Sequence, residues 1–156
     1  RLQLKRADNL VFLSVPVNSD VFREAVYMVN PKRVILNFSV LSDYTFKGFL
    51  TLLFEILKKS TATGEGSLEL YEISMMLGVE EEIVRTALKY LKAAGKIDYI
   101  YEPDDITVTV WRKNAAPSHD ISVHEKKLVN ALLEKNAYQS FIKKLKCHMF
   151  KEYLKV

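Results

Sequence analysis

The sequence predicts a mixed α/β fold, and three observations support this class. Two short apolar runs rich in β-branched residues flank a helical pattern near the N-terminus. Three further helical patterns, followed by two alternating strands, occupy the middle of the chain. The composition has 49% apolar and 27% charged residues but only 5 Gly and 4 Pro, which is typical of compact domains and excludes a disordered or low-complexity protein.

Residues 1–39 are predicted to form a βαβ unit. The run 9–16 is apolar and ends at a proline, as buried strands often do, and 33–38 is a second such run. Between them, a helix begins with the N-cap chemistry of Asn18, Ser19 and Asp20. The short connections predict parallel strands. One such unit cannot cover its own sheet, so we expect it to complete a sheet elsewhere or to pack on the helices predicted after residue 40.

Residues 40–113 are predicted to form a winged-helix module. Helices are expected at 44–59, 68–77 and 80–94, the first of them capped by Ser42 and Asp43. The polar segment 60–67 is expected to be a loop, and helix ends are expected at Gly78 and Gly95. Two alternating runs then predict a β-hairpin with strands at 97–101 and 106–111. Helices followed by a hairpin are the element order of a winged helix.

Residues 114–156 are predicted to form a linker and two basic helices, at 122–135 and 141–154, the second capped by Ser140. In the second helix, lysines alternate with apolar residues. Such a helix can dock on its own domain with a solvated lysine face, follow a nucleic-acid backbone, or bind an acidic peptide that has a hydrophobic end. The candidate binding residues are Phe141, Lys143, Lys144, Lys146 and Tyr153.

The formal net charge of +4 is unevenly distributed along the chain. Residues 1–39 carry +3, residues 40–117 carry −3 and residues 118–156 carry +4. Both ends are therefore basic and the middle is acidic. This distribution, more than the total, determines which partners the chain attracts.

The predicted location is cytoplasmic. A single cysteine, Cys147, leaves no internal disulfide and fits a reducing compartment. No apolar run reaches the roughly 18 residues of a membrane span, and no signal peptide opens the chain. The first residue is Arg1 and not methionine, so we expect this chain to be part of a longer one.

No catalytic or metal-binding motif is found. The spacing of His119, His124 and His148 matches no zinc site, and the sequence has no phosphate-binding glycine loop. The carboxylates of residues 80–82 fall in the first turn of a predicted helix, where negative charge favours the helix dipole. The chain is therefore predicted to be noncatalytic and to hold no cofactor of its own.

Duplex recognition by the winged-helix module is disfavoured by charge. A winged helix places its third helix in the major groove, and here that helix opens with three glutamates. The predicted wing tip at 102–105 is also acidic. Three cations, Arg85, Lys89 and Lys92, nevertheless share one helical stripe and are candidate DNA or partner contacts. We prefer the interpretation that they form a solvated face and pair with Glu81 and Glu82.

The order of these segments resembles the extra C-terminal domain of bacterial RecJ-type single-stranded-DNA-specific exonucleases, over almost the whole chain. The similar stretches are 10–30, Pro31 to Phe38 (PKRVILNF), 44–57, 73–78, Leu88 to Ile97 (LKYLKAAGKI), and 120–138 with its Asp120-Ile121-Ser122 start and Tyr138-Gln139-Ser140 end. The order of the motifs, more than any single one, carries this resemblance.

The resemblance implies an accessory role within an enzyme that degrades single-stranded DNA from 5′ to 3′ in recombination and repair. The catalytic motifs of that family, which bind manganese or magnesium, lie in its N-terminal domains, and nothing in this sequence matches them. The implied partners are the single-stranded-DNA-binding protein or another repair protein, the upstream nuclease domains, and single-stranded DNA itself. The alternative is a DNA-binding winged-helix transcription regulator; a small enzyme is the least supported reading.

Overall fold

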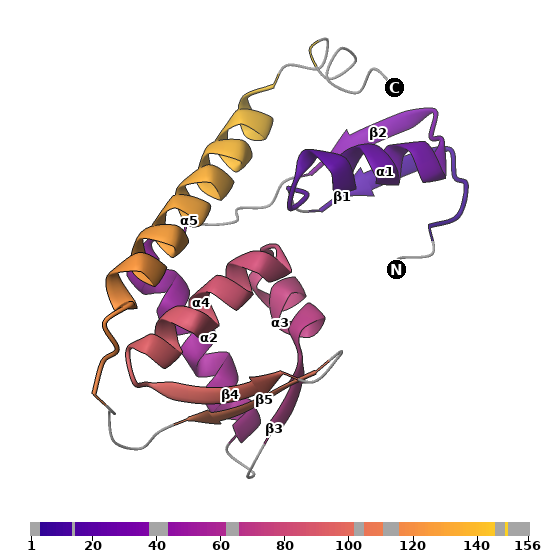
Figure 1. The fold of residues 1–156 in the computed structure, drawn as a ribbon. Coiled ribbons are helices and arrows are strands. Elements are labelled where there is room, and N and C mark those ends of the chain that lie inside the picture. The colour runs from indigo at the N-terminus through magenta and orange to yellow at the C-terminus, as the bar shows by residue number, and fades with distance from the viewer. Residues whose placement is uncertain are drawn as a thin grey trace. The chain divides into compact units, whose positions relative to one another are not determined.

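The computed structural model describes residues 4–13, 15–37, 44–61, 66–101, 105–110, 116–145 and 149. The predicted mixed α/β class is confirmed (Figure 1). The chain divides into two compact units. Unit 1 comprises residues Arg1–Asp43 and Lys135–Val156, and unit 2 comprises Tyr44–Glu134.

Unit 1 contains the predicted βαβ arrangement. Strands β1 (Asn9–Phe12) and β2 (Arg33–Leu36) pair in parallel, and α1 (Ser19–Val29) connects them. The side-chain oxygen of Asn18 accepts a hydrogen bond of 2.9 Å from the backbone N–H of Val21, which caps α1 as predicted. At the other end Asn30 adopts a left-handed conformation with φ 45°, and its N–H bonds the Val26 carbonyl.

A small apolar core holds unit 1 together. Its buried members are Val15, Phe22 and Ile142, and Phe12 and Leu36 pack against them from the two strands. The rings of Phe12 and Phe22 meet edge to face with centroids 4.7 Å apart. Because Ile142 lies far along the sequence, the C-terminal part of the chain closes the core that the βαβ unit cannot complete by itself.

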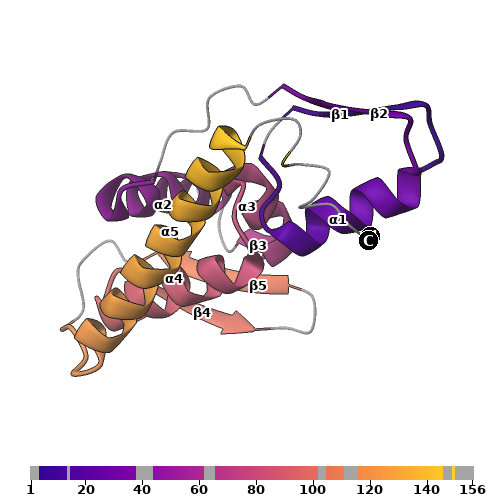
Figure 2. The same ribbon diagram turned by 90° about the horizontal axis from the view of Figure 1, so that it is seen from above.

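Unit 2 places three helices against an antiparallel sheet. The helices are α2 (Phe46–Thr61), α3 (Leu70–Leu77) and α4 (Glu81–Ala93), and the strands are β3 (Gly66–Glu69), β4 (Ile97–Tyr101) and β5 (Asp105–Val110). The strand order is β3-β5-β4, with both pairings antiparallel (Figures 1 and 2). The hairpin of β4 and β5 confirms the sequence prediction.

The core of unit 2 is larger than that of unit 1. Phe49, Leu53 and Leu57 of α2 are completely buried beside apolar side chains of α3 and α4. The hydroxyl of Tyr44 donates a 2.7 Å hydrogen bond to the Leu77 carbonyl and so joins the start of α2 to the end of α3. Burial raises the pKa of this hydroxyl.

Strand β3 differs from the expectation. Residues 60–67 were predicted to be a loop and 68–77 a helix, but a four-residue strand begins at Gly66 and the helix begins at Leu70. Glycine and serine at the start of the strand favour turns, and four residues are too few to show an alternating pattern. Pairing with β5, which lies far away in sequence, creates this strand.

The start of α2 also differs from the prediction. Ser42 and Asp43 lie outside the described residues, and the helix begins at Phe46 instead of at residue 44. Thr45 supplies the cap, because its hydroxyl oxygen accepts a 3.1 Å hydrogen bond from the N–H of Gly48.

One C-terminal helix replaces the first predicted helix and the start of the second. Helix α5 runs without a break from Ile121 to Lys144. Ser140 is therefore inside a helix instead of capping one. The intervening segment, residues 136–140, contains no glycine or proline that would end a helix, and the cap predicted at Ser140 is not formed. The first part of α5 contributes Leu128 and Leu132 to the core of unit 2, and its last turns belong to unit 1.

Candidate partner-binding surface

The end of α5 carries three of the predicted binding residues. Phe141 is 48% exposed, Lys143 and Lys144 are exposed, and Ile142 between them is 1% exposed. The buried Ile142 fixes the rotation of the helix on unit 1. Phe141 and Lys144 are three residues apart and so lie on neighbouring positions of the helix surface. Lys146 and Tyr153 lie outside the described residues.

Local chemistry explains why the helix tolerates two lysines here. The last carbonyl groups of a helix have no partners within it and carry a partial negative charge, which cations stabilise. Lys143 and Lys144 occupy the last turn of α5. Phe141 and Lys144 therefore present an aromatic ring beside an ammonium group, and Lys143 lies farther round the helix. An aromatic ring next to an ammonium group suits a ligand that combines a carboxylate with an apolar side chain.

The cationic stripe of α4 is largely engaged within unit 2. Arg85 forms an ion pair with Glu81 one turn earlier, at 3.5 Å, as the sequence suggested. Lys92 instead reaches strand β4, where it contacts Asp98 at 2.5 Å and lies 5.1 Å from the centroid of the Tyr99 ring. Lys89 is exposed. Arg85 and Lys92, two of the three predicted contact residues, therefore pair with side chains of unit 2 itself.

The contacts of Asp98 change the pKa of its carboxyl group. The hydrogen bond from Lys92 lowers the pKa of the Asp98 carboxyl, and a 2.9 Å bond from the backbone N–H of Tyr99 lowers it further. The carboxylate is thus held in its charged form by groups of α4 and β4. This pairing favours a structural role for Lys92.

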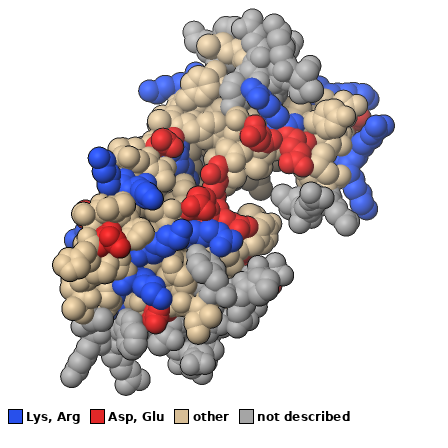
Figure 3. Space-filling view, in the orientation of Figure 1, with Lys and Arg blue, Asp and Glu red and all other residues tan. Residues whose placement is uncertain are grey.

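The two units carry opposite net charge. Unit 1 contains twelve basic and five acidic side chains, a net charge of +7, whereas unit 2 contains eleven basic and fourteen acidic ones, a net charge of −3. Figure 3 shows basic side chains along the right-hand edge of unit 1 and a mixture of both signs on the visible face of unit 2. A negatively charged partner is therefore attracted to unit 1.

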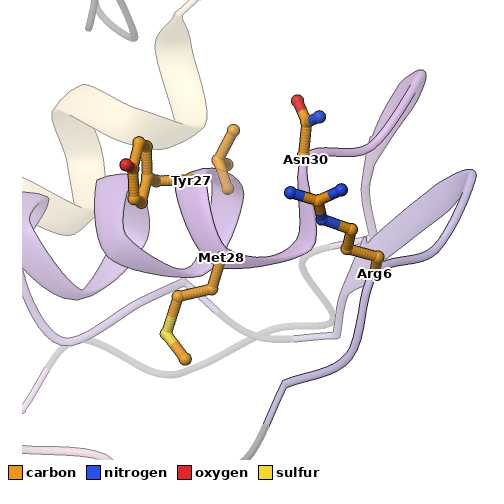
Figure 4. A pocket seen from close by; sticks show the side chains of 5 residues that line it. Arg6, Tyr27, Met28 and Asn30 are labelled. Carbon is orange, nitrogen blue, oxygen red and sulfur yellow. The ribbon is translucent and has the colours of Figure 1, made fainter.

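Unit 1 also contains a shallow hollow of about 450 Å³ that the sequence did not indicate. It is lined by Arg6, Val26, Tyr27, Met28 and Asn30. Figure 4 shows Arg6 extending towards Asn30 at the end of α1, while Tyr27 and Met28 project from different sides of the helix. Tyr27 is 72% exposed. An aromatic residue on the polar side of the predicted helix was the one sequence signal for this region.

In the part of the chain that the structure describes, no group of three or more His, Cys, Asp or Glu side chains is arranged to hold a metal ion. None of the described helices has the length and the apolar character of a membrane span. His119 and His124 lie near the start of α5, and Cys147 and His148 lie outside the described residues.

Comparison with protein-family models, with curated proteins and with solved structures gives no significant match to this chain.

Proposed function

We propose that this chain is a noncatalytic accessory part of a cytoplasmic 5′ to 3′ single-stranded-DNA-specific exonuclease that acts in recombination and repair. In this role, unit 1 binds an acidic segment of a partner protein, such as the single-stranded-DNA-binding protein, and unit 2 is the scaffold. The observation that carries the proposal is the separation of charge, +7 on unit 1 against −3 on unit 2. The enzymatic context comes from the resemblance of the motif order.

The end of α5 supplies the contact. Lys143 and Lys144 can each donate hydrogen bonds to carboxylates of the acidic segment, and the exposed ring of Phe141 can pack against an apolar side chain at its end. Single-stranded DNA is a second possible ligand of unit 1, because lysines and an exposed aromatic ring also suit its phosphates and bases. The resemblance places the manganese or magnesium of the parent enzyme in its upstream nuclease domains.

The element order of unit 2, with helices followed by a hairpin, supports a winged-helix assignment but not a regulator that reads duplex DNA. Glu81 and Glu82 occupy the first turn of α4, the end that would meet the bases. The cations Arg85 and Lys92 on this helix are paired with Glu81 and Asp98. The carboxylates in the first turn of α4 repel DNA phosphates, and the ion pairs along the helix reduce the attraction of its cations for them. Both effects weaken binding of duplex DNA.

The proposal is tested by fluorescence anisotropy with three labelled ligands: an acidic peptide with a C-terminal aromatic residue, single-stranded DNA and duplex DNA, each at low and near-physiological salt. We expect the chain to bind the peptide, and the double variant Lys143→Glu with Lys144→Glu to lose at least about tenfold in affinity, because two charge-assisted contacts become repulsive. The matched control is Lys126→Glu with Lys127→Glu, an adjacent exposed pair on the same helix in unit 2.

Three outcomes would overturn the proposal. Equal loss of affinity in the two double variants would mean that net charge, and not the end of α5, binds the peptide. Tight, salt-dependent binding of duplex DNA without peptide binding would favour the transcription regulator. Degradation of the labelled single-stranded DNA in the presence of manganese would contradict a noncatalytic role.

A further inference from the structure

One face of the two-stranded sheet in unit 1 is exposed. Along both strands, burial alternates with every residue, so that one face lies against the core and the other lies outward. Val11 and Ile35, which are direct neighbours across the strands, are 47% and 45% exposed. Parallel sheets are normally covered on both faces. Among the described residues of unit 1, the core cluster covers only the face that carries Phe12 and Leu36.

The outer edge of β2 pairs with no other strand among the described residues. The N–H of Arg33 bonds the Asp8 carbonyl at 3.0 Å, and the N–H of Asn37 bonds the Phe12 carbonyl at 2.9 Å. Residues 33, 35 and 37 therefore direct their backbone groups towards β1, and the alternation of a strand directs those of Val34 and Leu36 to the opposite edge. No further strand pairs with β1 or β2 among the residues that the structure describes.

The charge around this edge selects the kind of partner. Arg33 is exposed at the start of β2, and no carboxylate is present on either strand. The adjacent Lys32 contacts Asp8 at 3.1 Å. Pairing of two copies through this edge would bring two units of net charge +7 together, so repulsion disfavours that arrangement.

We propose that the outer edge of β2 binds an extended segment of another protein by strand addition. The backbone of this segment pairs with the N–H and C=O groups of Val34 and Leu36. It carries a carboxylate beside Arg33 and an apolar side chain beside Ile35, which covers part of the exposed face. Main-chain pairing provides the affinity, and the two side-chain positions provide the specificity.

The test uses the whole chain and a labelled peptide with the central sequence Glu-Val-Ile-Val-Glu between Gly and Ser residues. This sequence reads the same in both directions, so it presents a carboxylate to Arg33 in a parallel or an antiparallel arrangement. The matched probe is Lys-Val-Ile-Val-Lys with the same flanks. We expect the acidic peptide to bind at least about tenfold more tightly, and the variant Arg33→Glu to reverse this preference.

A second variant tests the backbone pairing itself. Val34→Pro removes the outward N–H, and an edge strand tolerates proline when that N–H does not bond its neighbour. We expect Val34→Pro to bind the acidic peptide roughly tenfold more weakly than Val34→Ala, which keeps the N–H. Hydrogen exchange should show that the peptide protects the amides of Val34 and Leu36.

The inference is overturned if both peptides bind Arg33→Glu and the unaltered chain with the same affinity, or if the peptide protects no amide of β2. It does not rest on the proposed exonuclease context. The variant Lys143→Glu with Lys144→Glu should retain binding of Glu-Val-Ile-Val-Glu, and loss of this binding would place the peptide on α5 instead of β2.

Discussion

The two units of this chain show how differently packed parts can share one polypeptide. Unit 2 buries a continuous core contributed by all three of its own helices, by β4 and by the first part of α5. Among the described residues of unit 1, the apolar core has three buried members, Val15, Phe22 and Ile142, and Val11 and Ile35 of the sheet are exposed. The well-packed unit is acidic and the sparsely packed unit is basic. Of the two, the charged and incompletely covered unit is the one whose surface favours binding.

The largest expected loss of stability comes from truncating the side chain at the centre of the core of unit 1. Phe22 is fully buried and contacts the ring of Phe12, so Phe22→Ala should reduce the stability of unit 1 by about 3–5 kcal/mol. Because unit 2 has its own core, its amides should stay protected. Hydrogen exchange followed by mass spectrometry measures both units in one experiment.

Two variants control for this comparison. Tyr27→Ala removes an aromatic ring from the same helix at a position that is 72% exposed, and it should leave exchange in β1 and β2 nearly unchanged. Leu53→Ala opens a cavity in the core of unit 2 and should increase exchange there. If Phe22→Ala increased exchange equally in both units, they would unfold as one body and the comparison would be wrong.

Sequence patterns predicted those parts of the fold that depend on local chemistry. The β-branched runs at the N-terminus, the capping residue Asn18 and the left-handed glycines Gly78 and Gly95 all act within a few residues of their position. Strand β3 was missed because its partner β5 lies about forty residues later in the sequence. The break predicted before Phe141 was wrong because Ser140, whose side chain favours a cap, lies inside α5.

The candidate site shows the same division. The exposure of Lys143 and Lys144 follows from the helical spacing of lysines and apolar residues, which the sequence reveals. Phe141, which the same spacing assigned to the apolar face, is instead 48% exposed. The contact of Lys92 with Asp98 joins a helix to a strand, and the hollow at Arg6 joins segments that are about twenty residues apart. Contacts of this kind depend on tertiary packing and have no signature in local spacing.

Loss of the N-cap of α1 should reduce the stability of unit 1 by a moderate amount. Asn18→Ala removes the acceptor of the Val21 N–H and should destabilise the helix by about 1 kcal/mol. In a unit with a small core, this change should be visible as faster exchange in α1. Asn18→Ser restores an acceptor and should recover most of the protection. Equal exchange in the Ala and Ser variants would show that the hydrogen bond contributes nothing.

The smallest expected effect is the pH dependence of the ion pair in unit 2. The pKa of Asp98 is lowered chiefly by the hydrogen bond from Lys92, so the pair stabilises the fold above the ordinary carboxyl pKa of about 3.9. This contribution is lost as the pH falls through the lower pKa of the folded state. Both side chains are about half exposed, so Asp98→Asn should reduce the free energy of unfolding by less than about 1 kcal/mol at pH 7.

Thermal unfolding of Asp98→Asn, Lys92→Gln and the double variant at pH 7 and pH 3 measures the coupling between the two side chains, which should shrink at the lower pH. A coupling that instead grew as the pH fell would mean that Asp98 is stabilised in its neutral form.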